Sequence, residues 1–82
     1  MGILRRWLEY DAAKNGLRAL VSPDEYEVAM HYARGCGRWR ADVVRYIAVA
    51  FCLGFTVQWA CDLHTQGVPR GDLLGLAREL HR

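Results

Sequence analysis

Two cysteines and two histidines have the spacing that comes closest to a metal site. Cys61 and His64 are three residues apart, which places both side chains on one face of a helix. His31 and Cys36 lie near a glycine-containing break, so a tetrahedral site with two sulfur and two nitrogen ligands can be drawn. Nothing in the spacing fixes its geometry, and buried free cysteines behave as small hydrophobic residues. We therefore predict no metal and no cofactor.

Catalytic chemistry has weaker support. Cys36 lies between two glycines and close to His31. Cys36 as nucleophile and His31 as general base form the single catalytic pair that the sequence suggests. The chain has one serine, Ser22, and no glycine-rich phosphate loop that follows a strand. A tight turn with an incidental cysteine explains the first pattern as well. The sequence therefore predicts a protein that is not an enzyme.

Arginine and tryptophan are the residues whose placement most favours binding. Ten of the eleven basic residues are arginine, and arginine, tryptophan and tyrosine dominate the energetic centres of protein interfaces. We predict the main partner-binding surface between residues 34 and 45 and a second patch near the N-terminus. The residues of the first are Arg34, Arg38, Trp39, Arg40 and Arg45, and those of the second are Arg5, Arg6 and Trp7. Packing in the core is the alternative for Trp7 and Trp59, whereas Trp39 is expected to be partly exposed.

Helical periodicity positions these residues. From Ile3 to Val21 apolar residues recur at steps of three and four, which predicts an amphipathic helix. Either this helix is continuous or the Asn15-Gly16 pair divides it into two pieces. Ser22-Pro23-Asp24-Glu25 is a capping box with proline in the first turn, so a second helix begins there. That helix is expected to end at Gly35-Cys36-Gly37.

A long uncharged segment runs from Tyr46 to Cys61. It belongs to a predicted third helix from Arg38 to Gln66, which bends near Gly54 and ends before Gly67 and Pro69. Asp72 is expected to cap a fourth helix that reaches Leu80. The fold class is all-α: one domain, residues 1–82, forming a small irregular bundle of about four helices around a central apolar helix.

The apolar segment also raises the question of what covers it. A chain this short buries little surface by itself, so we predict a homo-oligomer, in the first place a dimer, that buries part of Tyr46 to Cys61. The alternative is a single-span membrane protein with a helix over residues 43–61 and Arg45 reaching the interface. The odd number of cysteines and the arginines near the start favour the cytoplasm.

The function class that these observations favour is non-enzymatic binding of a larger macromolecule, in the first place a protein. An accessory, regulatory or inhibitory role, such as that of a small phage- or mobile-element-encoded protein, suits this size. Binding of nucleic acid is the alternative, because Ala33, Gly37, Val43 and Tyr46 have the spacing of a helix-turn-helix motif. Arg38 and Arg40 would then open the helix that reads DNA.

Overall fold

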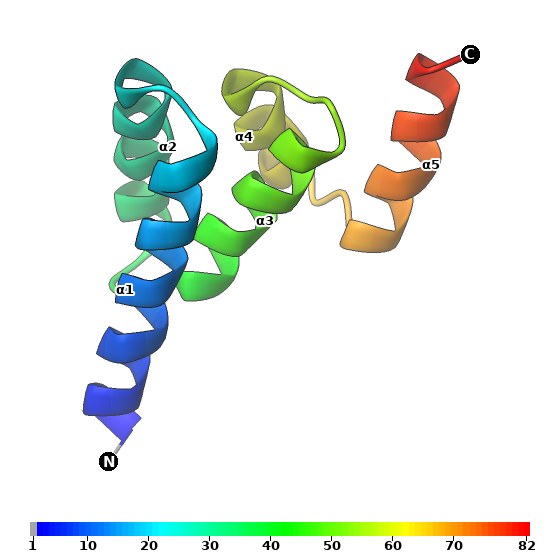
Figure 1. Ribbon diagram of the computed structural model, residues 1–82. Helices are drawn as coiled ribbons and strands as arrows, with labels where there is room; N and C mark the ends of the chain where they lie inside the picture. The colour runs from blue at the N-terminus through cyan, green and yellow to red at the C-terminus, as the bar shows by residue number, and fades with distance from the viewer. Residues whose placement is uncertain (1) are drawn as a thin grey trace.

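The polypeptide forms helices joined by short turns. A computed structural model describes residues 2–82, in which there are five helices and no strand. The helices are α1 (Gly2–Leu20), α2 (Pro23–Cys36), α3 (Ala41–Cys52), α4 (Val57–Thr65) and α5 (Arg70–Leu80). Successive helices run in alternating directions, and α3 contacts each of the other four (Figure 1). The all-α class and the central apolar helix are confirmed, with one helix more than predicted.

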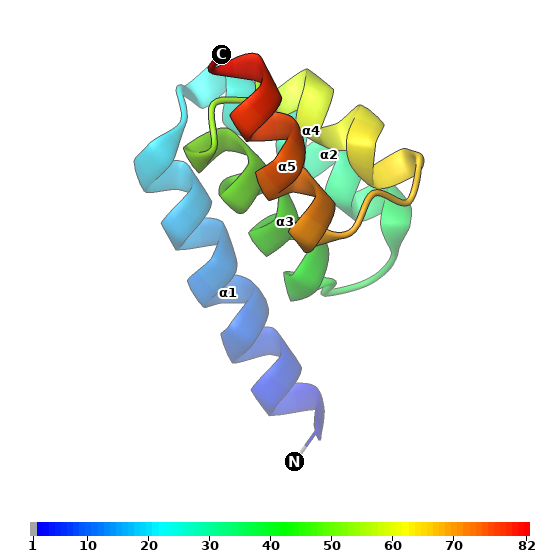
Figure 2. The ribbon, with the colours of Figure 1, turned by 90° about the vertical axis from the view of Figure 1, so that its right-hand side faces the viewer.

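Helix α1 is continuous through Asn15 and Gly16, so of the two alternatives the undivided helix is correct. Ala13 and Leu17, on either side of this pair, are both buried. Burial of these side chains outweighs the helix-propensity cost of a glycine, about 1 kcal/mol. The N-terminal half of α1 extends beyond the other helices (Figure 2), and Ile3 and Leu4 there are exposed.

The start of α2 has the predicted capping box. The Glu25 N–H donates to Ser22 Oγ and the Ser22 N–H donates to Glu25 Oε1, both over 3.2 Å. Pro23 is the first helical residue, and α2 ends at Cys36 as expected.

Helix α3 begins at Ala41, three residues later than the predicted start at Arg38. Trp39 has a φ of +56°, a left-handed conformation that a helix cannot contain and that residues with large side chains rarely adopt. Gly37 has a φ of +141°. Both residues therefore belong to a turn that reverses the chain between α2 and α3.

The predicted third helix is in fact two helices, so the single helix from Arg38 to Gln66 is wrong. Gly54, with a φ of +105°, ends α3 at the position where a bend was expected. Thr56 then caps α4, because its Oγ1 accepts the Trp59 N–H at 3.1 Å. Residues 43–61 are thus not one helix, and within residues 2–82 none is long and apolar enough to cross a membrane.

Helix α5 begins at Arg70 directly after Pro69, and Asp72 lies in its first turn instead of capping it. Gly67, with a φ of +79°, ends α4 as predicted. The Tyr46 hydroxyl donates to the Val68 carbonyl at 2.6 Å, which ties the α4–α5 connection to α3.

The core lies around α3. Most apolar side chains of the segment from Tyr46 to Cys61 are buried within one copy of the chain, so this segment has protein around it without a partner. Its use in self-association stays a prediction. Trp7 and Trp59 are 47% and 41% exposed, so the alternative that they pack in the core is wrong, whereas Trp39 is partly exposed as predicted.

Candidate functional site

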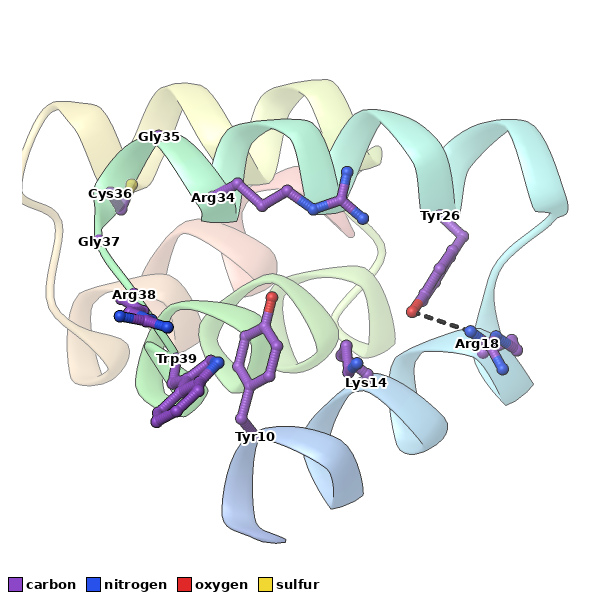
Figure 3. A pocket seen from close by; sticks show the side chains of 10 residues that line it. All are labelled: Tyr10, Lys14, Arg18, Tyr26, Arg34, Gly35, Cys36, Gly37, Arg38 and Trp39. Atoms are coloured by element: carbon purple, nitrogen blue, oxygen red, sulfur yellow. Dashed lines mark hydrogen bonds between the residues drawn. The ribbon is translucent and has the colours of Figure 1, made fainter. Parts of the chain in front are cut away.

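An open cleft of about 640 Å³ lies between α1, α2 and the turn that follows α2 (Figure 3). It has four basic and three aromatic side chains. Its lining residues are Tyr10, Lys14, Arg18, Tyr26, Arg34, Gly35, Cys36, Gly37, Arg38 and Trp39. We call this feature the basic cleft.

The spacing of the residues along each helix places the side chains of each wall on the side that faces the cleft. Tyr10, Lys14 and Arg18 follow one another at steps of four on α1, so they share one face. On α2, Tyr26 points toward α1, and Arg34 extends along α2 in the direction of Tyr26 (Figure 3). An Arg18 Nη2–H donates to the Tyr26 hydroxyl at 3.2 Å and joins the walls at one end of the cleft.

The turn closes the other end. The left-handed conformation of Trp39 directs its ring toward Tyr10 (Figure 3), and the Arg38 guanidinium carbon lies 4.8 Å from the centre of the Trp39 ring. This cation–π contact holds an arginine beside an aromatic surface. Backbone strain in a large residue is often found where the conformation serves binding.

Charge in the basic cleft is poorly compensated. No carboxylate belongs to its lining, and the nearest ion pair joins Lys14 Nζ to Asp11 Oδ1 over 3.9 Å. Arg18 is bonded to a neutral phenol, and neither Arg34 nor Arg38 has a salt bridge within residues 2–82. The cleft is therefore a positively charged site that favours anions.

Tyr10 remains a neutral phenol in this environment. Burial raises its pKa above the ordinary value, although the positive charge of Arg34 partly offsets this effect. Lys14 Nζ lies 4.9 Å from the centre of the Tyr10 ring. The hydroxyl can donate a hydrogen bond to a ligand oxygen, while the ring offers an apolar face.

The structure brings three of the eight predicted binding residues into the cleft, namely Arg34, Arg38 and Trp39. Arg40 points elsewhere, because its guanidinium donates to Asp42 over 2.9 and 2.7 Å. Arg45 lines other hollows, one of them between α1 and α3.

The second predicted patch lies apart from the cleft lining. Arg5, Arg6 and Trp7 are on the projecting half of α1, where Arg5 pairs with Glu9 at 3.3 Å. Of these, Trp7 is three residues before Tyr10 and therefore on the same side of the helix. It extends the aromatic surface of the cleft toward the N-terminus.

Sequence reasoning missed Tyr10, Lys14, Arg18 and Tyr26. The signal for the first three was the repeat of aromatic and basic residues at four-residue steps in α1. Only the packing of α1 beside α2 brings these residues to the turn.

The candidate metal ligands do not converge. Cys61 is buried, which raises the pKa of its thiol to about 11, and His31 is exposed. His64 Nδ1 lies 2.7 Å from the Tyr32 hydroxyl, which also lies 3.0 Å from Thr65 Oγ1. Among residues 2–82 no three histidine, cysteine or carboxylate side chains are grouped to hold a metal ion.

The helix-turn-helix interpretation fits the core but not the surface. Ala33, Val43 and Tyr46 are buried, as the motif requires. However, α3 would be the helix that enters a DNA groove, and it is the centre of the bundle. Its exposed residues are Asp42, Arg45 and Cys52. Arg38 and Arg40 precede α3 instead of opening it.

No protein-family model matches the chain, and neither a curated protein nor a solved structure matches it. The geometry and charge of the basic cleft are therefore the basis for a functional proposal.

Proposed function

We propose that the protein is a non-enzymatic binding protein whose basic cleft takes an acidic segment of a larger protein. The observation that carries this proposal is the set of four basic side chains in one cleft that no carboxylate lines. An accessory, regulatory or inhibitory role follows from such binding. The three free cysteines suit a reducing compartment such as the cytoplasm.

The shape of the cleft supports a chain segment over an enclosed small molecule. The cleft is open along its length, and its aromatic side chains are half-buried, so each offers one face to a ligand. Beyond Tyr10 the same side of α1 carries Trp7 and then Ile3, both exposed. A segment with carboxylates for the arginines and apolar residues for this extension matches both parts.

The surrounding charges support protein over nucleic acid. Asp11 lies at the edge of the cleft, where its Oδ1 is 3.9 Å from Lys14 Nζ. This carboxylate would repel a continuous row of phosphates. The net charge of +2 is also small for a nucleic-acid-binding surface.

Trp39 provides a way to test this proposal by fluorescence. Trp7→Phe and Trp59→Phe leave it as the single tryptophan, and the probe is a short peptide of glutamates interrupted by leucines. We expect saturable binding that weakens with salt and is absent for the same peptide with glutamine in place of glutamate. Arg34→Ala with Arg38→Ala is expected to weaken binding about tenfold or more, because each arginine provides a charge-assisted hydrogen bond.

The matched control removes two exposed arginines of the C-terminal region, with Arg78→Ala and Arg82→Ala, and so gives the same net charge. We expect its affinity to equal that of the parent. Equal weakening in both double variants would indicate a general charge effect and contradict a specific cleft, as would no saturable binding of the acidic peptide. Tighter binding of duplex or single-stranded DNA at the same salt concentration would replace the protein partner by nucleic acid.

A further inference from the structure

An exposed row of uncharged residues runs along the whole of α1. Leu4, Leu8, Ala12, Gly16 and Leu20 follow one another at steps of four, and each is exposed. The three leucines are 62%, 53% and 45% exposed, from first to last. We call these five residues the α1 ridge.

The ridge lies beside the packed side of α1. The buried residues of α1 are Ala13 and Leu17, which in an ideal helix lie roughly 100° and 140° around the axis from Ala12. Ala12, Gly16 and Leu20 are exposed but also line a groove between α1 and α3, whereas Leu4 and Leu8 lie on the projecting half of the helix. Tyr10 and Lys14 of the basic cleft lie on yet another side.

We propose that the α1 ridge binds the same ridge of a second copy, with the two α1 helices antiparallel about a two-fold axis at Ala12. In this arrangement Ala12 meets its equivalent, and Leu8 of each copy lies opposite Gly16 of the other. Leu4 and Leu20 come together at both ends. A two-fold interface requires a self-complementary surface, and this one has small residues at its centre and paired leucines at its ends. This proposal goes beyond the binding function proposed above and does not rest on it.

The packing and the size of this contact are those of a weak dimer. Ridges of residues four apart pack into each other at a crossing angle of about −50°, the commonest class in globular proteins. A Cβ at Gly16 would meet nothing within 4 Å in the chain itself, so this side is open to a second helix. With α1 roughly 28 Å long, the contact would bury on the order of 1,000 Å² in total, the lower limit for specific interfaces.

Charge complementarity supports a second copy as the occupant. A groove of about 370 Å³ beside the ridge, between α1 and α3, has Arg45 and Arg70 among its lining. Neither arginine has a salt bridge in the described part of the chain. Glu9 lies on the groove side of the ridge, because it shares a face with Ala13 and Gly16. Within the chain its Oε1 pairs only with the exposed Arg5 Nε, at 3.3 Å. Antiparallel packing brings Glu9 of one copy toward the groove of the other.

The composition of the ridge is less suited to a lipid surface. Its middle consists of Ala12 and Gly16, which would contribute little apolar area to a membrane. Glu9 beside it would also be repelled by anionic lipids. The basic cleft is on a different side of α1, so a dimer would present two clefts at once.

Sedimentation velocity from about 5 to 500 µM tests the dimer, because a contact of this size predicts a dissociation constant in the micromolar range. We expect the chain to change from monomer to dimer over this range, and Ala12→Arg to remain monomeric because two guanidinium groups would meet at the axis. The control is Val28→Arg, which places the same charge at an exposed apolar position of α2 and is expected to dimerise normally. Circular dichroism checks that both variants are folded.

A cysteine variant tests the register independently. Ala12→Cys, with Cys52→Ser to remove an exposed native thiol, is expected to form a disulfide-linked dimer under mild oxidation, and Val28→Cys in the same background is not. A wild-type chain that stays monomeric, Ala12→Arg that still dimerises, or a dimer without the crosslink would overturn the proposal. Assembly beyond two copies, or a monomer that binds phosphatidylserine vesicles through Leu8, would overturn it as well.

Discussion

At the scale of single residues, Arg40 and Asp42 form the shortest ion pair in residues 2–82, with Arg40 Nη2 and Asp42 Oδ2 2.7 Å apart. The pKa of Asp42 is lowered to about 2, mainly by the hydrogen bonds that Arg40 donates to its carboxylate. Because the folded-state pKa lies below the ordinary value near 3.9, the stabilisation is complete above about pH 4 and is lost as the pH falls toward 2. Solvent screens most of the stabilisation that this ion pair could contribute, since both side chains are largely exposed.

We predict that the Asp42 carboxyl titrates near pH 2 in the folded protein. Carbon-13 NMR of the side-chain carboxyl measures this value directly. Arg40→Ala is expected to move the midpoint up toward about 4, the value of an unperturbed aspartate. If the midpoint is the same with and without Arg40, the ion pair does not exist in solution.

Trp39 combines an unfavourable backbone conformation with a place in the cleft. We predict that Trp39→Gly changes the free energy of unfolding by less than about 1 kcal/mol, because relief of the left-handed strain offsets the lost packing. Binding of the acidic peptide is expected to weaken, as followed by calorimetry. The control is Trp59→Ala, which removes an exposed tryptophan outside the cleft and should not affect binding. A loss of several kcal/mol from Trp39→Gly would show that the ring has a structural role.

At the scale of elements, the capping box of α2 predicts a stability change that leaves binding intact. Ser22→Ala removes the hydroxyl that accepts the Glu25 N–H, so it is expected to lower the free energy of unfolding by about 1 kcal/mol. For a domain of this size that is a decrease of about 4–8 °C in melting temperature. Ser22→Asn preserves a capping side chain and should restore most of the loss. If Ser22→Ala weakened binding at unchanged stability, Ser22 would be a contact residue.

Local signals predicted the elements wherever they agreed with tertiary packing. Ser22-Pro23 began a helix as expected, and Gly67 ended one. The division of the apolar segment was missed because Thr56, a capping residue, lies inside a run that otherwise has helical composition. A division at Gly16, which the local residue types allow, did not occur, since burial of Ala13 and Leu17 holds α1 together.

The residues in and next to the turn of the candidate site could be predicted from the sequence, whereas those that α1 contributes could not. Arg34, Arg38 and Trp39 are close in the sequence, so composition alone identified them. Tyr10 and Lys14 join them only because α1 packs beside α2, and no local pattern specifies that arrangement. The left-handed backbone of Trp39 was equally unpredictable, because residue type argues against it.

At the scale of the whole molecule, α1 determines both proposed surfaces. The molecule measures 45 × 25 × 18 Å, and the N-terminal half of α1 extends beyond the bundle (Figure 2). One side of this helix contributes Tyr10, Lys14 and Arg18 to the basic cleft, and another presents the α1 ridge. The prediction that α1 is amphipathic is therefore wrong for the helix as a whole, because its apolar residues point in more than one direction. Of the two surfaces, the basic cleft is the proposed binding site for the partner.

NMR of the isotope-labelled protein, titrated with the glutamate- and leucine-containing peptide, tests this claim most directly. We predict that the largest shift changes occur at the backbone amides of Tyr10 and Lys14 and at those of Arg34 to Trp39, including the indole N–H of Trp39. The amides of α5 should change little, and Arg34→Ala with Arg38→Ala should suppress the changes in the cleft. Shift changes concentrated on α5, or on the α1 ridge with the cleft unaffected, would contradict the account.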